Sequence, residues 1–139
     1  MNNYNYIKGS EIKKALEQQY RIYLCGGDHI KQSLPCLLDE QLEIGISDYA
    51  EFTADKPHYH TRATEYNFVV KGSSKVLMIE TGEEQLFEEG SIYVLDANTK
   101  YACKNAPGTM IYFIKCPGGN DKQVIATTDD IINWLSSWD

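Results

Sequence analysis

Two histidines and a glutamate lie close together in the sequence, and their spacing suits metal binding. His58 and His60 are two of only three histidines in 139 residues. Residues i and i+2 of a strand project from the same face about 6.6 Å apart, so both imidazoles can approach one ion at roughly 2.1 Å. Glu65 lies at an odd offset from His60, which an unbroken strand would place on the opposite face. A turn over residues 61–64 would return Glu65 to the same face, and the three side chains would then form an accessible metal site.

The neighbouring segments carry further polar side chains that would share this face. Asn67 lies two positions after Glu65 and could orient a ligand or a water molecule. Further along the chain, Tyr101, Cys103 and Asn105 occupy alternate positions, so a strand would project them from one face. If the two histidines point into a barrel, we expect these three side chains to point there too.

Two basic residues, Arg62 and Lys100, are expected near the open end of such a barrel. They could attract a carboxylate or phosphate group of a substrate despite the negative net charge of the chain. The alternative for each is an ordinary solvated surface charge. His29, the third histidine, follows two glycines and is expected to be exposed.

Short strands separated by turn residues must position these groups. The expected strands cover residues 21–25, residues 41–47, a segment ending at His60, a segment starting at Glu65, and residues 75–80, 85–87, 91–95, 100–104 and 110–115. Many short strands at 8–12-residue spacing predict a β-sandwich or barrel. Ser10 is expected to cap a helix over about residues 11–19, and Thr127 or Thr128 to cap a closing helix over about residues 128–138.

The spacing of the histidines and the glutamate also matches a known motif. Together with Gly72, the segment reads His-x-His-x4-Glu-x6-Gly, and it resembles the first motif of the cupin superfamily. That motif opens with a glycine six residues before the first histidine, and Phe52 occupies the position here.

A second segment resembles the second cupin motif, Gly-x5-Pro-x-Gly-x2-His-x3-Asn. Gly90 and Asn105 lie where this pattern requires them. Asp96 replaces the proline, Asn98 replaces the turn glycine, and Tyr101 replaces the histidine that would be a third metal ligand. Asparagine tolerates a positive φ angle, so Asn98 can take over the turn of the glycine.

The resemblance implies an all-β protein with the cupin double-stranded β-helix, a jelly-roll barrel. It covers about residues 40–118 of a chain that we expect to form a single domain over residues 1–139, with short helices at both ends. It also implies one divalent transition metal (manganese, iron, nickel or zinc) and a small polar ligand in the barrel. Cupins commonly form dimers, so a homodimer is expected through the strand at residues 21–25 or through Trp134 and Trp138. The alternative is that both tryptophans pack on the chain's own barrel.

Three roles are open for Tyr101. It could ligate the metal as a phenolate, which requires its pKa of about 10 to fall sharply. It could remain a phenol that donates a proton or a hydrogen bond to a substrate. It could also only fill space, because the chain contains ten tyrosines. Cys103 could supply a thiolate instead, but it lies two residues beyond the motif position.

The resemblance leaves three functions open, because the cupin fold serves many activities. The first is a metal-dependent enzyme that acts on a small organic acid or carbohydrate derivative, with the metal on His58, His60 and Glu65. The second is a metal-free isomerase or epimerase of sugar nucleotides, with a histidine as base and Tyr101 as acid. The third is a barrel that binds a small ligand without turnover.

The composition narrows the partners and the compartment. The formal net charge of −7 and the absence of a basic cluster in the sequence disfavour binding to nucleic acid or to anionic membrane surfaces. The N-terminal residues do not resemble a signal peptide, and no apolar run is long enough to span a membrane. The four cysteines show no Cys-x-x-Cys pairing, so we expect reduced thiols and a cytoplasmic location.

Overall fold

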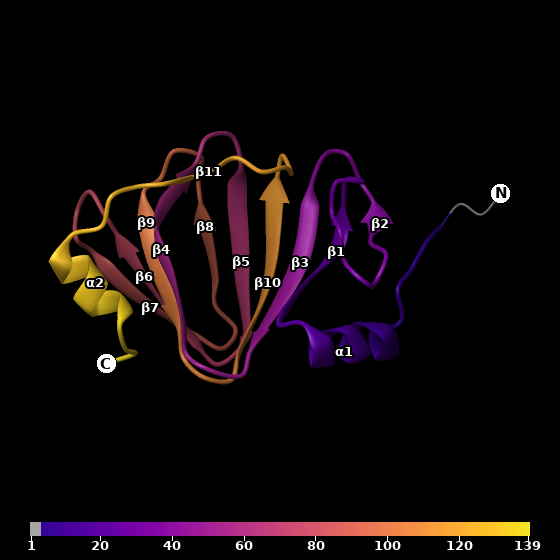
Figure 1. Ribbon diagram of the computed structural model, residues 1–139, viewed down its shortest axis with the longest axis horizontal. Helices are drawn as coiled ribbons and strands as arrows, with labels where there is room; N and C mark the ends of the chain where they lie inside the picture. The colour runs from indigo at the N-terminus through magenta and orange to yellow at the C-terminus, as the bar shows by residue number, and fades with distance from the viewer. Residues whose placement is uncertain (1–3) are drawn as a thin grey trace.

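Two β-sheets face each other like the sides of a barrel in the computed structural model, which describes residues 4–139 (Figure 1). The first sheet has the order β2 (Leu37–Leu38), β1 (Arg21–Gly26), β3 (Glu43–Tyr49), β10 (Thr109–Cys116), β5 (Thr64–Lys71) and β8 (Ile92–Leu95). The second has the order β11 (Lys122–Val124), β4 (Thr53–His60), β9 (Tyr101–Asn105), β6 (Ser73–Met78) and β7 (Glu84–Glu88). All neighbouring strands are antiparallel except β1 and β2. The predicted all-β jelly-roll fold is confirmed.

Strand register brings the predicted site residues to the inner faces of the two sheets. In the second sheet, His58 of β4 lies opposite Tyr101 of β9, next to an irregularity in β4 that begins after Asp55. In the first sheet, Glu65 of β5 lies opposite Lys115 of β10. Because paired residues project from the same face, groups that are far apart in the sequence share one interior.

The turns between the strands follow the local chemistry of their residues. Gly72 joins β5 to β6 with φ near +82°, and a Cβ atom there would lie 2.6 Å from the Cα of Thr109. A side chain at this position would therefore meet both a strained backbone and a steric clash. Asn98 has φ of 67°, the only positive φ of a non-glycine residue in the described part of the chain. The prediction that Asn98 replaces a turn glycine is confirmed.

The two helices lie near the predicted positions with different ends. α1 (Gly9–Gln18) begins before Ser10, so the prediction of a Ser10 cap is wrong; instead the Glu11 carboxylate accepts a hydrogen bond from the backbone N–H of Lys8 at 3.0 Å. α2 (Asp129–Leu135) is capped by Thr128, whose hydroxyl oxygen accepts the N–H of Ile131 at 3.3 Å. Within residues 4–139, neither helix has the length and apolar character needed to cross a membrane.

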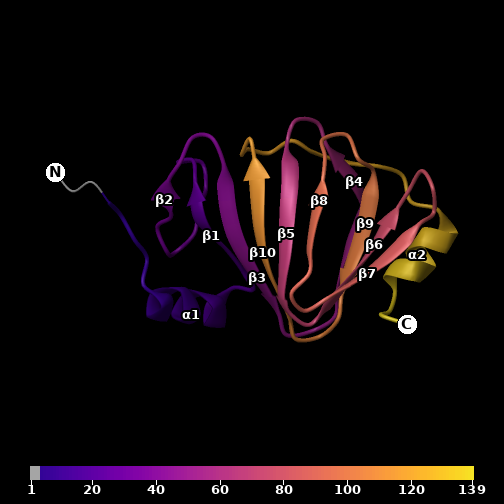
Figure 2. The same ribbon diagram turned by 180° about the vertical axis from the view of Figure 1, so that it is seen from behind.

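The C-terminal helix packs on the outer face of the second sheet (Figures 1 and 2). The Nζ of Lys104 donates hydrogen bonds to the carbonyl oxygens of Trp134 at 2.8 Å and Ser137 at 2.9 Å, and it lies 4.3 Å from the centre of the Trp134 ring. Lys75 makes the same kind of contact with the carbonyl oxygen of Trp138 at 2.9 Å and with its ring at 4.4 Å. Both tryptophans therefore pack on the chain's own barrel.

A side-chain amide takes the place of a neighbouring strand beside the middle of β1. Tyr23 donates its backbone N–H to the Oε1 of Gln32 at 2.8 Å, and the Nε2 of Gln32 donates to the carbonyl oxygen of Tyr23 at 2.7 Å. The same Nε2 also donates to the carbonyl oxygen of Leu34 at 2.6 Å. The strand predicted at residues 21–25 therefore has its central backbone groups paired on this side.

Candidate active site

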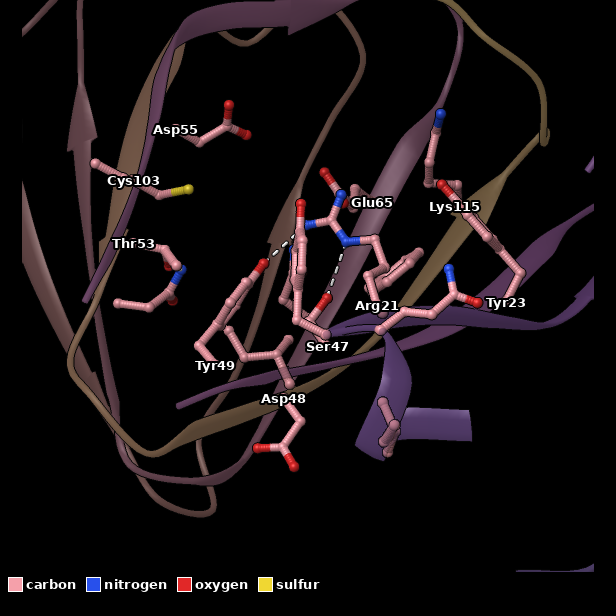
Figure 3. Close-up of a pocket in the computed structure, with 18 of the residues that line it drawn as sticks. Arg21, Tyr23, Ser47, Asp48, Tyr49, Thr53, Asp55, Glu65, Cys103 and Lys115 are labelled. Carbon is pink, nitrogen blue, oxygen red and sulfur yellow. Dashed lines mark hydrogen bonds between the residues drawn. The ribbon is translucent and has the colours of Figure 1, made fainter. Parts of the chain in front are cut away.

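A cavity of about 860 Å³ lies between the two sheets, and Figure 3 shows some of the residues that line it. All seven residues predicted to share one face line this cavity: His58, His60, Glu65, Asn67, Tyr101, Cys103 and Asn105. A volume of this size can hold a small organic molecule.

His60 is oriented by Asp121, a carboxylate from the segment just before β11. The Nδ1 of His60 lies 2.8 Å from the Oδ1 of Asp121, and its Nε2 lies 3.7 Å from the Oε2 of Glu65. An ionised carboxylate only accepts hydrogen bonds, so the Nδ1 of His60 carries the hydrogen. In the neutral imidazole, the lone pair is then on the Nε2 atom, which faces Glu65.

The environment of Asp121 keeps its carboxylate ionised. Its Oδ2 accepts the backbone N–H groups of Arg62 at 2.9 Å and Ala63 at 2.8 Å, and the Nζ of Lys115 lies 3.5 Å from its Oδ1. Burial on its own would raise the pKa of Asp121. The hydrogen bonds from the two N–H groups and from His60 outweigh burial and hold the pKa well below its usual range. Asp121 therefore fixes both the histidine and the turn that follows it.

His58 is buried and neutral at physiological pH. Its Nδ1 donates to the backbone carbonyl oxygen of Lys56 at 2.7 Å, and only 1% of the residue is exposed. Burial lowers the pKa of His58, and this effect exceeds the opposing effect of the hydrogen bond. The His58 ring lies 5.4 Å from the ring of His60 and 4.4 Å from the ring of Tyr101.

Tyr101 is held as a protonated phenol beside Glu65. Its hydroxyl group donates a hydrogen bond to the Oε2 of Glu65 at 2.8 Å. Burial raises the pKa of Tyr101 far above its usual value, and the negative charge of Glu65 adds to the increase. The Tyr101 hydroxyl group and the Nε2 of His60 thus approach the same carboxylate oxygen.

His58, His60 and Glu65, the metal ligands implied by the cupin motif, have some of the features of a metal site. Both histidines direct their Nδ1 hydrogens to protein acceptors, which is the usual arrangement for metal-binding imidazoles. The expected third ligand, Glu65, accepts a hydrogen bond from Tyr101 at its Oε2 atom. Within residues 4–139, no three His, Cys, Asp or Glu side chains are grouped to hold a metal ion.

The other predicted residues have different positions relative to the cavity. Asn105 accepts the Ser74 hydroxyl hydrogen and donates to the Thr53 hydroxyl oxygen, so it links three strands of the second sheet. Burial raises the pKa of Cys103, which keeps the thiol protonated. Asn67 is 8% exposed and lines the cavity.

Arg62 and Lys100 are absent from the described residues that line the cavity. Arg62 is exposed in the turn between β4 and β5, and its contact with Asp121 is made by its backbone. Lys100 lies 3.7 Å from Glu80. His29 is exposed as expected, and it lies 3.4 Å from Glu43.

Three residues of the site have no place in the motif-based prediction. Arg21 and Lys115 line the cavity, and Asp121 contacts the cavity residues His60 and Lys115. Asp121 lies 61 positions after His60 and follows a Gly-Gly-Asn segment, which signals only a loop. Lys115 lies at the end of a predicted strand. Arg21 opens the first strand of the barrel, where a basic residue is unremarkable without knowledge of the strand pairing.

Comparison with known proteins identifies the family and the fold. The family model described as Cupin matches residues 31–137, and no curated protein matches the chain. The structure of KdgF from Halomonas sp. has a TM-score of 0.53 and 20% sequence identity, covering 60% of this chain and 74% of that protein.

Two further structures share the fold at lower sequence identity. Pac13, a nucleoside dehydratase from Streptomyces, has a TM-score of 0.55 and 12% identity over 66% of this chain and 74% of its own. The DMSP lyase DddQ from Ruegeria pomeroyi has a TM-score of 0.56 and 15% identity over 77% of this chain and 50% of its own. With its double-sheet barrel and a family match over most of its length, the chain belongs to the cupin family.

Proposed function

We propose that this cupin is an enzyme that catalyses proton transfer on a small polar molecule bound in the barrel. The observation that supports the proposal is a pair of hydrogen bonds, one between Asp121 and His60 and one between Tyr101 and Glu65. The Nε2 of His60 and the hydroxyl group of Tyr101 both approach the Oε2 of Glu65 in the cavity. A base and an acid beside one cavity suit an isomerisation, an epimerisation or an elimination of a carbohydrate derivative or an organic acid.

His60 acts as the general base through its Nε2 atom. The hydrogen bond from its Nδ1 to Asp121 places the free lone pair on the side of Glu65. When the Nε2 accepts a proton from the substrate, the imidazolium that forms is stabilised by the Asp121 carboxylate. Asp121 acts through His60, so it is a positioning residue.

Tyr101 acts as the general acid. Its hydroxyl group is protonated and donates a hydrogen bond to Glu65, so it has a proton to give to a developing oxyanion or a leaving group. The group turns from Glu65 to the substrate oxygen when the substrate is bound. Glu65 holds the hydroxyl group in place until then.

The activities of similar structures support an enzymatic role. They include a nucleoside dehydratase, a DMSP lyase and a polyketide cyclase. The structures of Pac13 with uridine bound carry a tyrosine-to-phenylalanine or a histidine-to-glutamine substitution. These proteins are distant in sequence, so they support the reaction class and leave the substrate open.

Hydrogen exchange measures proton transfer before the full reaction is known. We would incubate the protein in D₂O with a panel of sugar nucleotides, nucleosides and small carbonyl-containing acids, and follow loss of C–H signals by ¹H NMR. The proposal predicts exchange or conversion of at least one compound, and a decrease of about a hundredfold or more in the His60→Gln variant.

Asn133→Gln is a control for this experiment, because Asn133 lies on α2 outside the cavity lining. Tight binding of a panel compound with no exchange or conversion would favour the alternative of a ligand-binding barrel without turnover. Unchanged exchange in His60→Gln would refute the role of His60 as the base.

A metal-dependent enzyme is the second candidate, favoured by the free Nε2 atoms of both histidines. His58, His60 and Glu65 would hold a divalent manganese, iron, nickel or zinc ion once Tyr101 releases Glu65. When bound, such an ion supplies Lewis-acid polarisation of a carbonyl or carboxylate group.

Metal content separates the two candidates. Untagged protein, before and after incubation with each of the four metals, would be compared with a His58→Ala/His60→Ala variant by elemental mass spectrometry. About one equivalent of metal that is lost in the variant supports the second candidate. No metal in either protein, even after incubation, would contradict it.

A further inference from the structure

We propose that Arg21 is the receptor for an oxyanion of the substrate, either a carboxylate or a phosphate group. This inference rests on the proposed function, because it defines the substrate class of the same cavity. Arg21 is exposed to solvent and lines the cavity together with His60, Glu65 and Tyr101. Figure 3 shows its guanidinium group pointing into the space between the sheets.

The guanidinium group of Arg21 is fixed in position by its neighbours. Its Nε donates to the hydroxyl oxygen of Ser47 at 3.0 Å, and its Nη2 donates to the hydroxyl oxygen of Tyr49 at 2.8 Å. The Phe113 ring lies beneath it, with 5.4 Å between the guanidinium carbon and the ring centre. A group that is already ordered loses little entropy when it binds a ligand, so this arrangement favours recognition.

The same contacts leave donors available for a ligand. A guanidinium group has five N–H donors, and protein acceptors occupy only two of them in the described part of the chain. The remaining donors suit the planar, two-pronged geometry of a carboxylate or phosphate group. No Asp or Glu of residues 4–139 lies within ion-pair distance of Arg21.

The other cations of the cavity are already neutralised. Lys115 lies 3.5 Å from Asp121 and donates to the carbonyl oxygen of Gly119 at 2.7 Å. Lys122 pairs with Asp55 at 2.9 Å. Arg21 is therefore the cation of this cavity that lacks an acidic partner within the described residues, in a chain whose net charge is −7. An anionic ligand would supply the partner.

Arg21 reaches the cavity from the N-terminal part of the chain. It lies before residues 31–137, the part that matches the cupin family model. The pairing of β1 with β3 places Arg21 opposite Ser47, and this register carries the side chain to the cavity face. The barrel supplies the acid and base groups, and Arg21 of the N-terminal strand β1 supplies the anion receptor.

Isothermal titration at low ionic strength tests this proposal without turnover. The probes are inorganic phosphate and succinate, with glycerol as the uncharged reference. We expect wild-type protein to bind at least one anion more tightly than glycerol and Arg21→Gln to lose at least tenfold in affinity for it. The preferred probe distinguishes a phosphate from a carboxylate receptor.

Arg62→Gln is the matched comparison, because Arg62 is the only other arginine in the chain and does not line the cavity. We expect it to bind the anion as wild type does. Equal affinity of wild type and Arg21→Gln, a loss in Arg62→Gln alone, or no preference of wild type for either anion over glycerol would each overturn the proposal.

Two further variants separate the receptor from the chemistry and from the fold. His60→Gln should bind the anion as wild type does and lose turnover, so failure of the proposed reaction leaves the binding result interpretable. Tyr49→Phe removes one support of the guanidinium group and should weaken anion binding by about threefold. If Tyr49→Phe and Arg21→Gln both bind the anion with wild-type affinity, Arg21 is not the receptor. This conclusion holds even if either variant is less stable than wild type.

Discussion

Two cations in this barrel, Lys104 and Arg21, both lie beside an aromatic ring but differ in how many of their hydrogen-bond donors have a protein acceptor. Lys104 lies on the outer face of the second sheet, is 2% exposed, and donates to two carbonyl oxygens at the end of α2 beside the Trp134 ring. Arg21 lies on the cavity face over the Phe113 ring and keeps donors without a protein acceptor in the described chain. A cation whose hydrogen bonds end on the protein stabilises the fold, whereas a cation with donors to spare is suited to bind a ligand.

Replacement of Lys104 should give the largest effect on stability. In Lys104→Met, the carbonyl oxygens of Trp134 and Ser137 lose a charged donor and the Trp134 ring loses its cation, so the free energy of unfolding should fall by about 3 kcal/mol. Urea unfolding followed by tryptophan fluorescence measures this change, and anion binding at Arg21 should not change.

Lys75→Met is the matched control for that experiment. Lys75 donates to one carbonyl oxygen, that of Trp138 beyond the end of α2, so its loss should cost about 1 kcal/mol. A larger loss in Lys75→Met than in Lys104→Met would contradict the assignment of Lys104 as the main anchor of α2.

Replacement of Tyr101 should separate activity from stability inside the cavity. In Tyr101→Phe the ring remains but the proton donor is lost, so turnover should fall by about a hundredfold, equivalent to about 2.7 kcal/mol. The unfolding free energy should change by only about 1 kcal/mol, the value of one hydrogen bond. Steady-state kinetics on the compound found by hydrogen exchange, together with urea unfolding, tests both statements; wild-type turnover in Tyr101→Phe would refute the acid role.

Low pH should reduce the stability of the protein through protonation of Asp121. The pKa of this carboxyl is held below its unfolded value of about 3.9. Its contribution to stability is therefore complete above that pH and is lost as the pH falls toward the lower folded pKa. The unfolding free energy, measured by urea titration from pH 7 to pH 2, should fall in this acid range.

Asp121→Asn should reduce this acid dependence, because the variant has no carboxyl group at the position. Asp28→Asn, which changes an exposed aspartate, serves as the comparison and should retain the wild-type dependence. Identical pH profiles for Asp121→Asn and wild type would contradict the argument.

Replacement of Ser47 should have the smallest effect. Ser47→Ala removes the acceptor of the Arg21 Nε, which should reduce anion affinity by about threefold and the unfolding free energy by about 0.5 kcal/mol. Titration with inorganic phosphate or succinate measures the first change. Complete loss of anion binding in Ser47→Ala would show that the hydroxyl group itself is part of the receptor.

Local patterns in the sequence were sufficient to predict most of the barrel. Side-chain alternation predicted the strands around His58, Glu65 and Tyr101, and the turn preference of asparagine predicted the positive φ of Asn98. The short strands β2 and β11 were missed, because two or three residues carry too little periodicity to be recognised.

The long-range partners of the site could not be predicted in the same way. Asp121 reaches His60 through loop closure, and Arg21 reaches the cavity through strand pairing. Neither contact leaves a local periodicity in the sequence. The contact of Lys104 with the carbonyl oxygens of Trp134 and Ser137 likewise depends on where the C-terminal helix packs. The motif therefore predicted the groups near His60, but not the carboxylate that orients it.

The amide of Gln32 has a consequence for how this protein behaves at high concentration. Sheet edges with unsatisfied backbone groups recruit strands from other molecules and start aggregation. Gln32 occupies both backbone groups of Tyr23, and β2 covers the far end of the same strand at Cys25 and Gly26. An incoming strand would have to displace this amide and would disturb Tyr23, which lines the cavity. One side chain therefore protects both the colloidal stability of the protein and the shape of its ligand cavity.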